Sequence, residues 1–243
     1  MARFPSGPFG NTGAPPLDYR TGINDVTVAQ FFNAVYAWMA VGLAVTAGVA
    51  YWVFMSSGGG LPLTMGTYIG LFVAELILVV VISSAINRIS ATVATALFVL
   101  YAALNGVTLS VIFFAYTKSS LASTFLVTAG AFGAMSLYGY VTKRDLTRLG
   151  SILFMALIGL ILASLVNVFW HNPMLYWIVS YAGVLIFVGL TAYDTQKLKN
   201  IAIQTGGNAA LANRLAIVGS LSLYLDFINL FLFLLRIMGN RRQ

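Results

Sequence analysis

The sequence predicts an all-α integral membrane protein built as a bundle of seven helices. Of its 243 residues, 60% are hydrophobic and only 8% are charged. Soluble domains carry about 25% charged residues, so this chain has too few to cover a surface facing water. Its apolar residues also form continuous stretches of roughly 20 residues, the length that a helix needs to cross a hydrocarbon core about 30 Å thick.

Seven such stretches follow one another, separated by charges, Gly/Ser runs and prolines. They are residues 31–55, 67–86, 91–116, 121–142, 149–169, 173–193 and 210–235. A β-barrel would instead show segments of alternating polarity about ten residues long, and a helical bundle is the other structure that pairs every backbone group in lipid. We therefore expect a transmembrane domain over residues 31–237, a flexible cytoplasmic tail over 1–30 and a short basic tail over 238–243.

The basic residues predict the orientation of the bundle. One side would hold the N-terminal segment and nine Lys and Arg residues: Arg3, Arg20, Arg88, Lys143, Arg144, Arg148, Lys197, Lys199 and Arg214. The other side holds only Lys118 before the C-terminus. Because Lys and Arg favour the cytoplasmic side, the N-terminus is predicted to be cytoplasmic. Seven full spans would place Arg236, Arg241 and Arg242 on the outer side, against this preference. The last stretch is therefore either a full crossing or a re-entrant hairpin.

Composition excludes several kinds of chemistry. The chain has no Cys and a single His, His171. Disulfides, thiolate metal sites, Cys nucleophiles and His-rich zinc sites are therefore excluded. The thin spread of cations along the chain forms no patch for nucleic acid. Oxygen ligands remain available, and these favour Ca²⁺ or Mg²⁺ over zinc.

Acidic residues inside the apolar stretches are the strongest functional signal. A charge at the centre of a bilayer is unfavourable by about 2.5 to 3.5 kcal/mol. Yet Glu75 lies in the middle of the second stretch, Asp194 closes the sixth and Asp226 lies deep in the seventh. Ser222 and Asn229 flank Asp226 at helical spacing, so the three side chains predict a polar stripe on one helix face.

Asp194 and Asp226 can face each other, because their stretches are consecutive and joined by about sixteen residues, which lets them pack antiparallel. Two neighbouring carboxylates in a low dielectric do not both ionise easily, so they share a proton and titrate as a unit. The pair therefore predicts a proton-sensitive latch whose carboxylates, once both ionised, repel each other or recruit a cation, either Arg88 or a metal ion such as Ca²⁺ or Mg²⁺. The alternatives are an interfacial Asp194 and an Asp226 that only glues helices together by hydrogen bonding.

Smaller residues add weaker signals. Asn105 and Thr108 share a face of the third stretch, where they line an ion path or make contacts between helices. Small residues that fit close helix packing are Gly130, Gly133, Ala134, Gly183 and Gly189.

Three runs of sequence resemble the bacterial branch of the Bax inhibitor-1 family, also called the transmembrane Bax inhibitor motif family. They are LYGYVTKRDLTRLG (137–150), GLTAYDTQKLKNIA (189–202) and SLSLYLDFINLFLFLLRIMG (220–239). The resemblance extends in order over residues 30–240. It implies two layers of three helices around a central C-terminal helix, and a pH-sensitive calcium leak in the bacterial inner membrane.

The resemblance also implies roles for individual residues. Asp194 and Asp226 match the family's pH-sensing pair and form the candidate calcium site, Arg88 matches its counter-ion, and Glu75 matches an acid that attracts cations. The other candidates for lining the path are Ser222, Asn229 and Asn105. We expect calcium ions and protons as the bound or transported species, no resident cofactor and no nucleic acid, while protein partners stay unspecified.

Two other functions stay open. Intramembrane aspartyl proteases also carry Tyr-Asp in helix six and Asp in helix seven, but they need Gly-x-Gly-Asp, whereas Leu223, Tyr224 and Leu225 precede Asp226 here. We therefore predict that the protein is not an enzyme. A regulatory membrane protein without transport, in which both aspartates are structural, is the second alternative. A retinal protein is excluded, because the last stretch has no Lys for a Schiff base.

Overall fold

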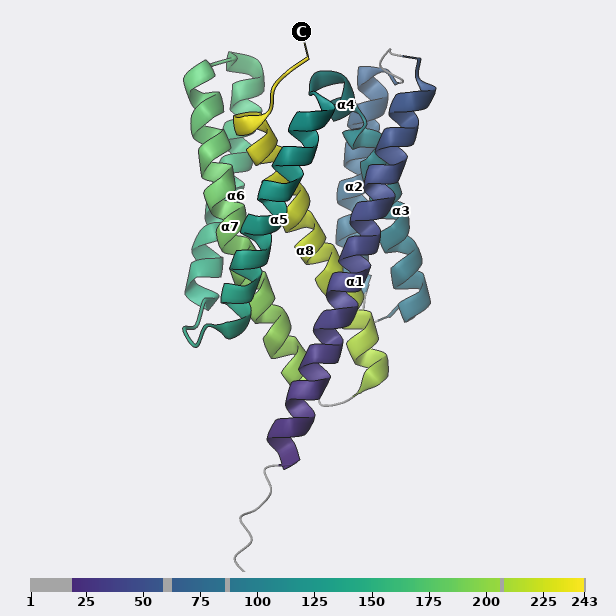
Figure 1. The fold of residues 1–243 in the computed structure, drawn as a ribbon, viewed down its shortest axis with the longest axis vertical. Coiled ribbons are helices and arrows are strands. Elements are labelled where there is room, and N and C mark those ends of the chain that lie inside the picture. Colours follow the sequence, from purple (N-terminus) through teal and green to yellow (C-terminus); the bar gives the residue numbers. More distant parts are fainter. Residues whose placement is uncertain (1–18, 59–62, 86–87, 206–207, 243) are drawn as a thin grey trace, which may run out of the picture.

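The computed structural model describes residues 19–58, 63–85, 88–205 and 208–242, and nearly all of these are helical (Figure 1). Seven helices are long and apolar enough to cross a membrane, which confirms the predicted fold class. They are α1 (Tyr19–Ser56), α2 (Met65–Ala85), α3 (Ala91–Leu109), α5 (Lys118–Val141), α6 (Thr147–Trp170), α7 (Pro173–Gln204) and α8 (Ala209–Met238). The short helix α4 (Val111–Ala115) follows α3.

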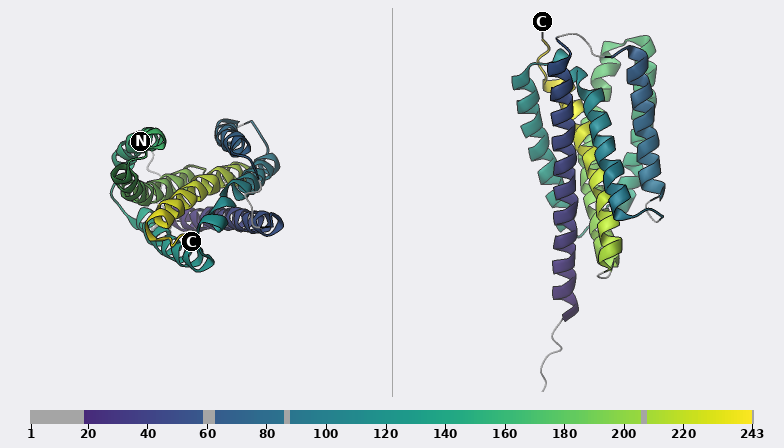
Figure 2. Two further views of the ribbon diagram at one scale, coloured as in Figure 1. Left: turned by 90° about the horizontal axis from the view of Figure 1, so that it is seen from above. Right: turned by 90° about the vertical axis from the view of Figure 1, so that its right-hand side faces the viewer.

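Helix α8 occupies the centre of the bundle. It packs against α1, α3, α5 and α7, while α2 packs mainly on α3 and α6 mainly on α7. Seen from above, α8 crosses between the two groups of helices (Figure 2). The structure thus has the predicted arrangement of two three-helix layers around a central C-terminal helix. Fully buried side chains concentrate on α8: Leu221, Leu223, Tyr224, Leu230 and Leu235.

The outer helices present apolar side chains to their surroundings. Large hydrophobic residues on α2 and α6, such as Val80 and Phe154, are more than half exposed. Exposed apolar area on this scale is unusual for a soluble protein. It matches a helix surface that faces lipid.

Two helix ends differ from the sequence prediction. Helix α7 continues to Gln204, about three turns beyond Tyr193, so Asp194 lies within the helix and not at its end. Helix α1 begins at Tyr19, so residues 19–30 are helical where a flexible tail was expected. Val28, near the end of this added segment, is buried in the core. The rest of the predicted tail, residues 1–18, lies outside the described residues.

The turn between α6 and α7 shows how the short connections are fixed. His171 ends α6 in the left-handed region, with φ of 50°. Asn172 then caps α7, where its side-chain oxygen accepts hydrogen bonds from the backbone N–H groups of Met174 (2.9 Å) and Leu175 (3.3 Å). Pro173 occupies the first helical position, where a missing N–H has no consequence.

Helix α8 is one continuous helix of 30 residues. It therefore crosses the bundle fully, which excludes the re-entrant hairpin, and its C-terminal end lies opposite the start of α1 (Figure 1).

The chain after α8 is fastened to the turn before α5. Arg242 N donates to Ala115 O (3.0 Å), and Asn240 N donates to Ser120 Oγ (2.8 Å). We call residues 239–242 the C-terminal strap. It was expected only as a short basic tail.

Candidate functional site

Helices α7 and α8 bring Asp194 and Asp226 together, as the sequence predicted. Ser222, one turn before Asp226 on α8, donates a hydrogen bond from its hydroxyl to Oδ2 of Asp194 at 2.6 Å. The charge of Asp194 acts electrostatically on Asp226. Lys197, one turn along α7, acts in turn on Asp194. The three polar residues Asp194, Ser222 and Asp226 form what we call the aspartate cluster.

Asp226 is the unusual member of the aspartate cluster. Its side chain is only 5% exposed, and its Oδ2 has no hydrogen-bond partner among the described residues. The predicted proximity to Asp194 is present, but no hydrogen bond joins the two carboxyl groups in the described part of the chain. Buried polar atoms without a partner are rare in folded proteins and call for a specific explanation.

Close helix contacts hold α7 in place around Asp194. A Cβ atom on Gly139 of α5 would lie 2.2 Å from the carbonyl oxygen of Ala192, so the two backbones touch there. A Cβ on Gly183 would lie 2.6 Å from the ring of Phe233 on α8. Any side chain at these two glycines would force the helices apart. Asp194 is therefore set in a closely packed region.

The predicted close packing of glycines is only partly correct. It holds at Gly183 and at Gly189, where a Cβ would lie 2.6 Å from the side chain of Leu153. It is wrong at Gly130 and Gly133, since added Cβ atoms there would meet no described atom within 4 Å.

A row of hydroxyl groups lies beside Asp194 and was not predicted. Tyr36 of α1 bonds to Ser136 of α5, and Ser136 Oγ lies 3.0 Å from Thr195 Oγ1 on α7. Thr195 in turn donates to the carbonyl of Thr191 (2.7 Å). The row links three helices by polar contacts next to the aspartate cluster. Single Ser, Thr and Tyr residues are too common in helices to have been recognised from the sequence.

Glu75 is the centre of a second polar cluster, on the other side of α8. It is 6% exposed, and its Oε1 accepts a hydrogen bond from Thr108 Oγ1 of α3 at 2.6 Å. Asn105, on the same helix, donates from Nδ2 to the hydroxyl of Tyr101 (3.3 Å). Asn105 and Thr108 were expected on one face of the third stretch, and both make contacts within or between helices.

Tyr224 connects this second cluster to α8. Its hydroxyl lies 2.7 Å from Thr46 Oγ1, and Thr46 donates its own hydrogen to the carbonyl of Ala102 (2.9 Å), so Tyr224 is the donor to Thr46. The rings of Tyr224 and Tyr101 lie edge to face with centroids 5.8 Å apart. Glu75 acts electrostatically on both tyrosines. These residues form what we call the glutamate cluster: Glu75, Thr108, Asn105, Tyr101, Tyr224 and Thr46.

The remaining predicted site residues lie apart from the aspartate carboxyl groups. Asn229 donates from Nδ2 to the carbonyl of Leu225 in its own helix (2.8 Å). Arg88 is exposed in the connection between α2 and α3, and no ion pair joins it to a described carboxylate. The expected pairing of Arg88 with the aspartates is therefore not present in this conformation.

The aspartate cluster offers few ligands for a metal. Among the described residues, no group of three or more His, Cys, Asp or Glu side chains could hold an ion. Ca²⁺ takes six to eight oxygen ligands, whereas Asp194, Asp226 and Ser222 supply fewer. A calcium ion at this position would have to keep several water ligands.

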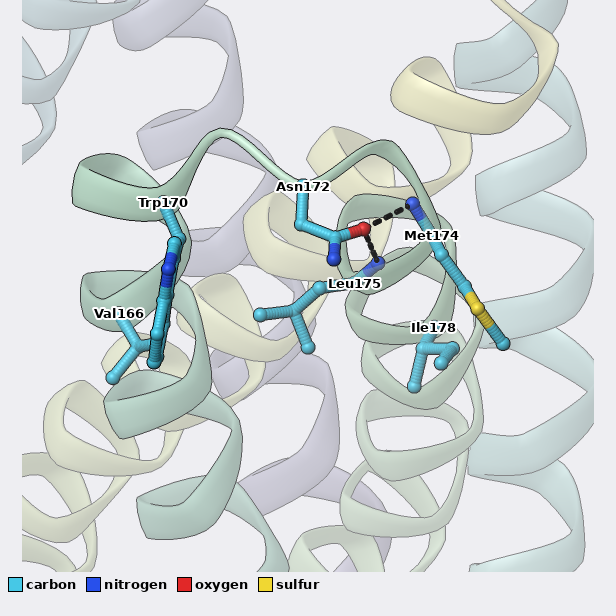
Figure 3. Close-up of a pocket in the computed structure, with 6 residues that line it drawn as sticks. All are labelled: Val166, Trp170, Asn172, Met174, Leu175 and Ile178. Carbon is cyan, nitrogen blue, oxygen red and sulfur yellow. Dashed lines mark hydrogen bonds between the residues drawn. The ribbon is translucent and has the colours of Figure 1, made fainter.

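An apolar pocket lies elsewhere, between the end of α6 and the start of α7 (Figure 3). It measures about 390 Å³ and is lined mainly by apolar side chains, including Val166, Trp170 and Ile178. Its amide group, that of Asn172, is already used to cap α7. The pocket therefore lacks the charged groups that an ion site requires.

Comparisons with known proteins agree with the resemblance seen in the sequence. The family described as "Inhibitor of apoptosis-promoting Bax1" matches residues 28–243. The chain is 58% identical to an Escherichia coli protein named inner membrane protein YbhL, over 87% of this chain and 92% of that protein. It is 47% identical to an uncharacterized protein of Deinococcus radiodurans, over 89% and 92% of the two chains. A Borreliella burgdorferi protein is 46% identical over 88% and 93%.

Proposed function

The chain belongs to the Bax inhibitor-1 family, and we propose that it is a pH-sensitive calcium leak or cation transporter of the inner membrane, gated by Asp194 and Asp226. The observation that carries this proposal is the buried Oδ2 of Asp226, which has no partner among the described residues. It lies in the central helix, within the electrostatic reach of a second carboxyl group. The free energy of such a pair depends on how many protons it holds.

The gate would work through repulsion between α7 and α8. While at least one of the two carboxyl groups is protonated, α7 and α8 stay packed together. When both groups are ionised, they repel each other strongly in the low dielectric, and they separate or attract a cation. The hydrogen bond from Ser222 to Asp194 opposes this separation, because it ties α7 to α8.

Glu75 and Arg88 have supporting roles in this proposal. Glu75 is a buried acid on the opposite side of α8, where it would attract a cation that passes along the central helix. Arg88 would serve as counter-ion only after a movement that brings it from its exposed position to the aspartates. The cytoplasmic placement of the N-terminus rests on the basic loops at the end where α1 begins.

The test is calcium entry into liposomes that contain the purified protein, measured at several pH values. The variants are Asp194→Asn, Asp226→Asn and the double variant. Asp145→Asn is the matched control, because Asp145 is an exposed acid in the connection between α5 and α6. We expect the pH dependence of flux to flatten in the three variants and to persist in the control.

Two results would overturn the proposal. One is wild-type flux equal to that of empty liposomes at every pH. The other is cleavage of a helical substrate by the solubilised protein that an aspartyl-protease inhibitor blocks. The second result is not expected, because Leu223 and Tyr224 are fully buried next to Asp226 and leave no room for a substrate strand.

A further inference from the structure

A second, polar pocket lies at the other end of α6 and α7. It measures about 180 Å³ and is lined by Thr147 at the start of α6 and by Gln196, Lys197, Asn200 and Gln204 on α7. Lys197, Asn200 and Gln204 are exposed. Their side chains supply an ammonium group and several amide N–H donors, the groups that bind a phosphate.

The connection between α5 and α6 adds charge to the rim of this pocket. Lys143, Arg144 and Arg148 are all exposed there. Gln196 fixes the connection in place: its Nε2 donates to the carbonyl of Arg144 and its Oε1 accepts from the N–H of Leu146, both at 2.8 Å. The backbone that carries these basic side chains is therefore fixed to α7, next to Thr147 of the pocket.

The charged residues near this pocket leave two basic side chains, those of Arg148 and Lys197, able to bind an anionic ligand. Asp145 accepts a hydrogen bond from the N–H of Thr147 at 2.8 Å, and the hydroxyl and N–H of Thr147 lower the pKa of Asp145, so it remains an anion. Lys199 is already engaged, because its Nζ donates to the carbonyl of Tyr140 (2.8 Å) and lies 4.9 Å from the centre of that ring. Arg148 and Lys197 make no hydrogen bond or cation–π contact with a described residue, although Lys197 also interacts electrostatically with Asp194.

Apolar side chains continue from this pocket along α6. Phe154 and Ile158 lie about two and three turns after Thr147 on the same side of the helix, and both are exposed. A cationic pocket above an apolar, lipid-facing stripe matches a molecule with an anionic head and an acyl tail. Basic pockets between transmembrane helices on the cytoplasmic side bind anionic lipid headgroups.

We propose that the pocket between Thr147 and Gln204 is a binding site for the phosphate of an anionic phospholipid. Lys197 and Arg148 hold the phosphate, and Asn200 and Gln204 donate hydrogen bonds to the headgroup. The acyl chains lie along Phe154 and Ile158 of α6. This site does not depend on whether the protein conducts ions.

The test is binding of phosphatidylglycerol to the full-length protein in detergent, followed by native mass spectrometry. Phosphatidylcholine and inorganic phosphate are the comparison ligands. The variants are Lys197→Gln and Arg148→Gln, and Lys118→Gln is the matched control, because Lys118 lies at the opposite end of the bundle over the ring of Tyr51. Each variant is expected to bind phosphatidylglycerol about fivefold more weakly, while the control and Lys197→Arg bind as the wild type does.

Three results would overturn the proposal. Equal weakening by Lys118→Gln would mean that only net charge attracts the lipid. Equal binding of phosphatidylcholine would mean that the pocket does not recognise an anionic head. Displacement of the lipid by inorganic phosphate at similar concentration would assign the pocket to a soluble anion. Far-ultraviolet circular dichroism of each variant separates loss of binding from loss of fold.

Discussion

The buried acids on the two sides of α8 differ in their hydrogen bonding. On the side facing α3, Glu75 accepts a hydrogen bond from Thr108 at 2.6 Å. On the side facing α7, Oδ2 of Asp226 has no partner among the described residues. A buried polar group left without a hydrogen bond is unfavourable by about 1–3 kcal/mol. The glutamate cluster therefore behaves as a satisfied part of the fold, whereas the aspartate cluster is held at the expense of stability.

The largest expected effect is on ion flux. Asp226→Asn should abolish the pH dependence of calcium entry, because an amide cannot ionise and the repulsion between two carboxylates is lost. Glu75→Gln should lower the flux but keep its pH dependence, since the amide oxygen still accepts from Thr108. Liposome assays over the same pH series compare the two variants directly. Flattened profiles in both would show that the two sides of α8 do not differ in function.

The next largest effect is on stability. Thr108→Val removes the hydroxyl that donates to Glu75 and should lower the free energy of unfolding by about 1–3 kcal/mol. Thermal unfolding in detergent measures the change. Ser84→Ala is the control, because Ser84 is exposed on α2 and bonds only within its own helix. A loss no larger than that of the control would mean that the glutamate cluster adds nothing to the fold.

A change of opposite sign is expected at Asp226. Asp226→Asn replaces a carboxyl group whose ionised form the interior does not solvate, and it breaks no hydrogen bond seen among the described residues, so it should raise the free energy of unfolding by about 1 kcal/mol. Chemical unfolding of wild type and variant near neutral pH tests the sign. Destabilisation as large as that of Thr108→Val would support a structural role for Asp226. The aspartate cluster and the glutamate cluster would then not differ in their contribution to stability.

The smallest effect is expected at Arg88. Because Arg88 is exposed and unpaired with any described carboxylate, Arg88→Gln should change stability by less than about 0.5 kcal/mol. The pH profile of calcium entry should also stay the same. A profile shifted as far as that of Asp194→Asn would mean that Arg88 reaches the aspartates in another conformation.

The sequence was sufficient for the number of helices and for the meeting of the two aspartates. Seven helices follow from apolar length alone, and the proximity of Asp194 and Asp226 follows because consecutive helices pack side by side. The end of α7 could not be found in this way. Polar residues such as Gln196 and Lys197 end the apolar run but are good helix formers, so the helix continues through them.

Contacts across the bundle were harder to predict. The hydrogen-bond partner of Glu75 is Thr108, more than thirty positions away. Nothing in the sequence indicates which acid a given Thr hydroxyl will bond to. The failure at Gly130 has a related cause. A small residue permits close packing but does not require it, and the partner helix decides whether a contact forms.

The C-terminal strap holds one end of α8, so a tilt of this helix about that end would displace its other end the most. Arg241 forms an isolated β-bridge with Tyr116, and Arg242 lies 5.5 Å from the centre of the Phe54 ring, so the strap anchors one end of α8 to other parts of the chain. At 1.5 Å per residue, Ala209 is more than twice as far from this anchored end as Asp226. A tilt that displaces Asp226 by about 2 Å would therefore swing Ala209 by roughly 5 Å.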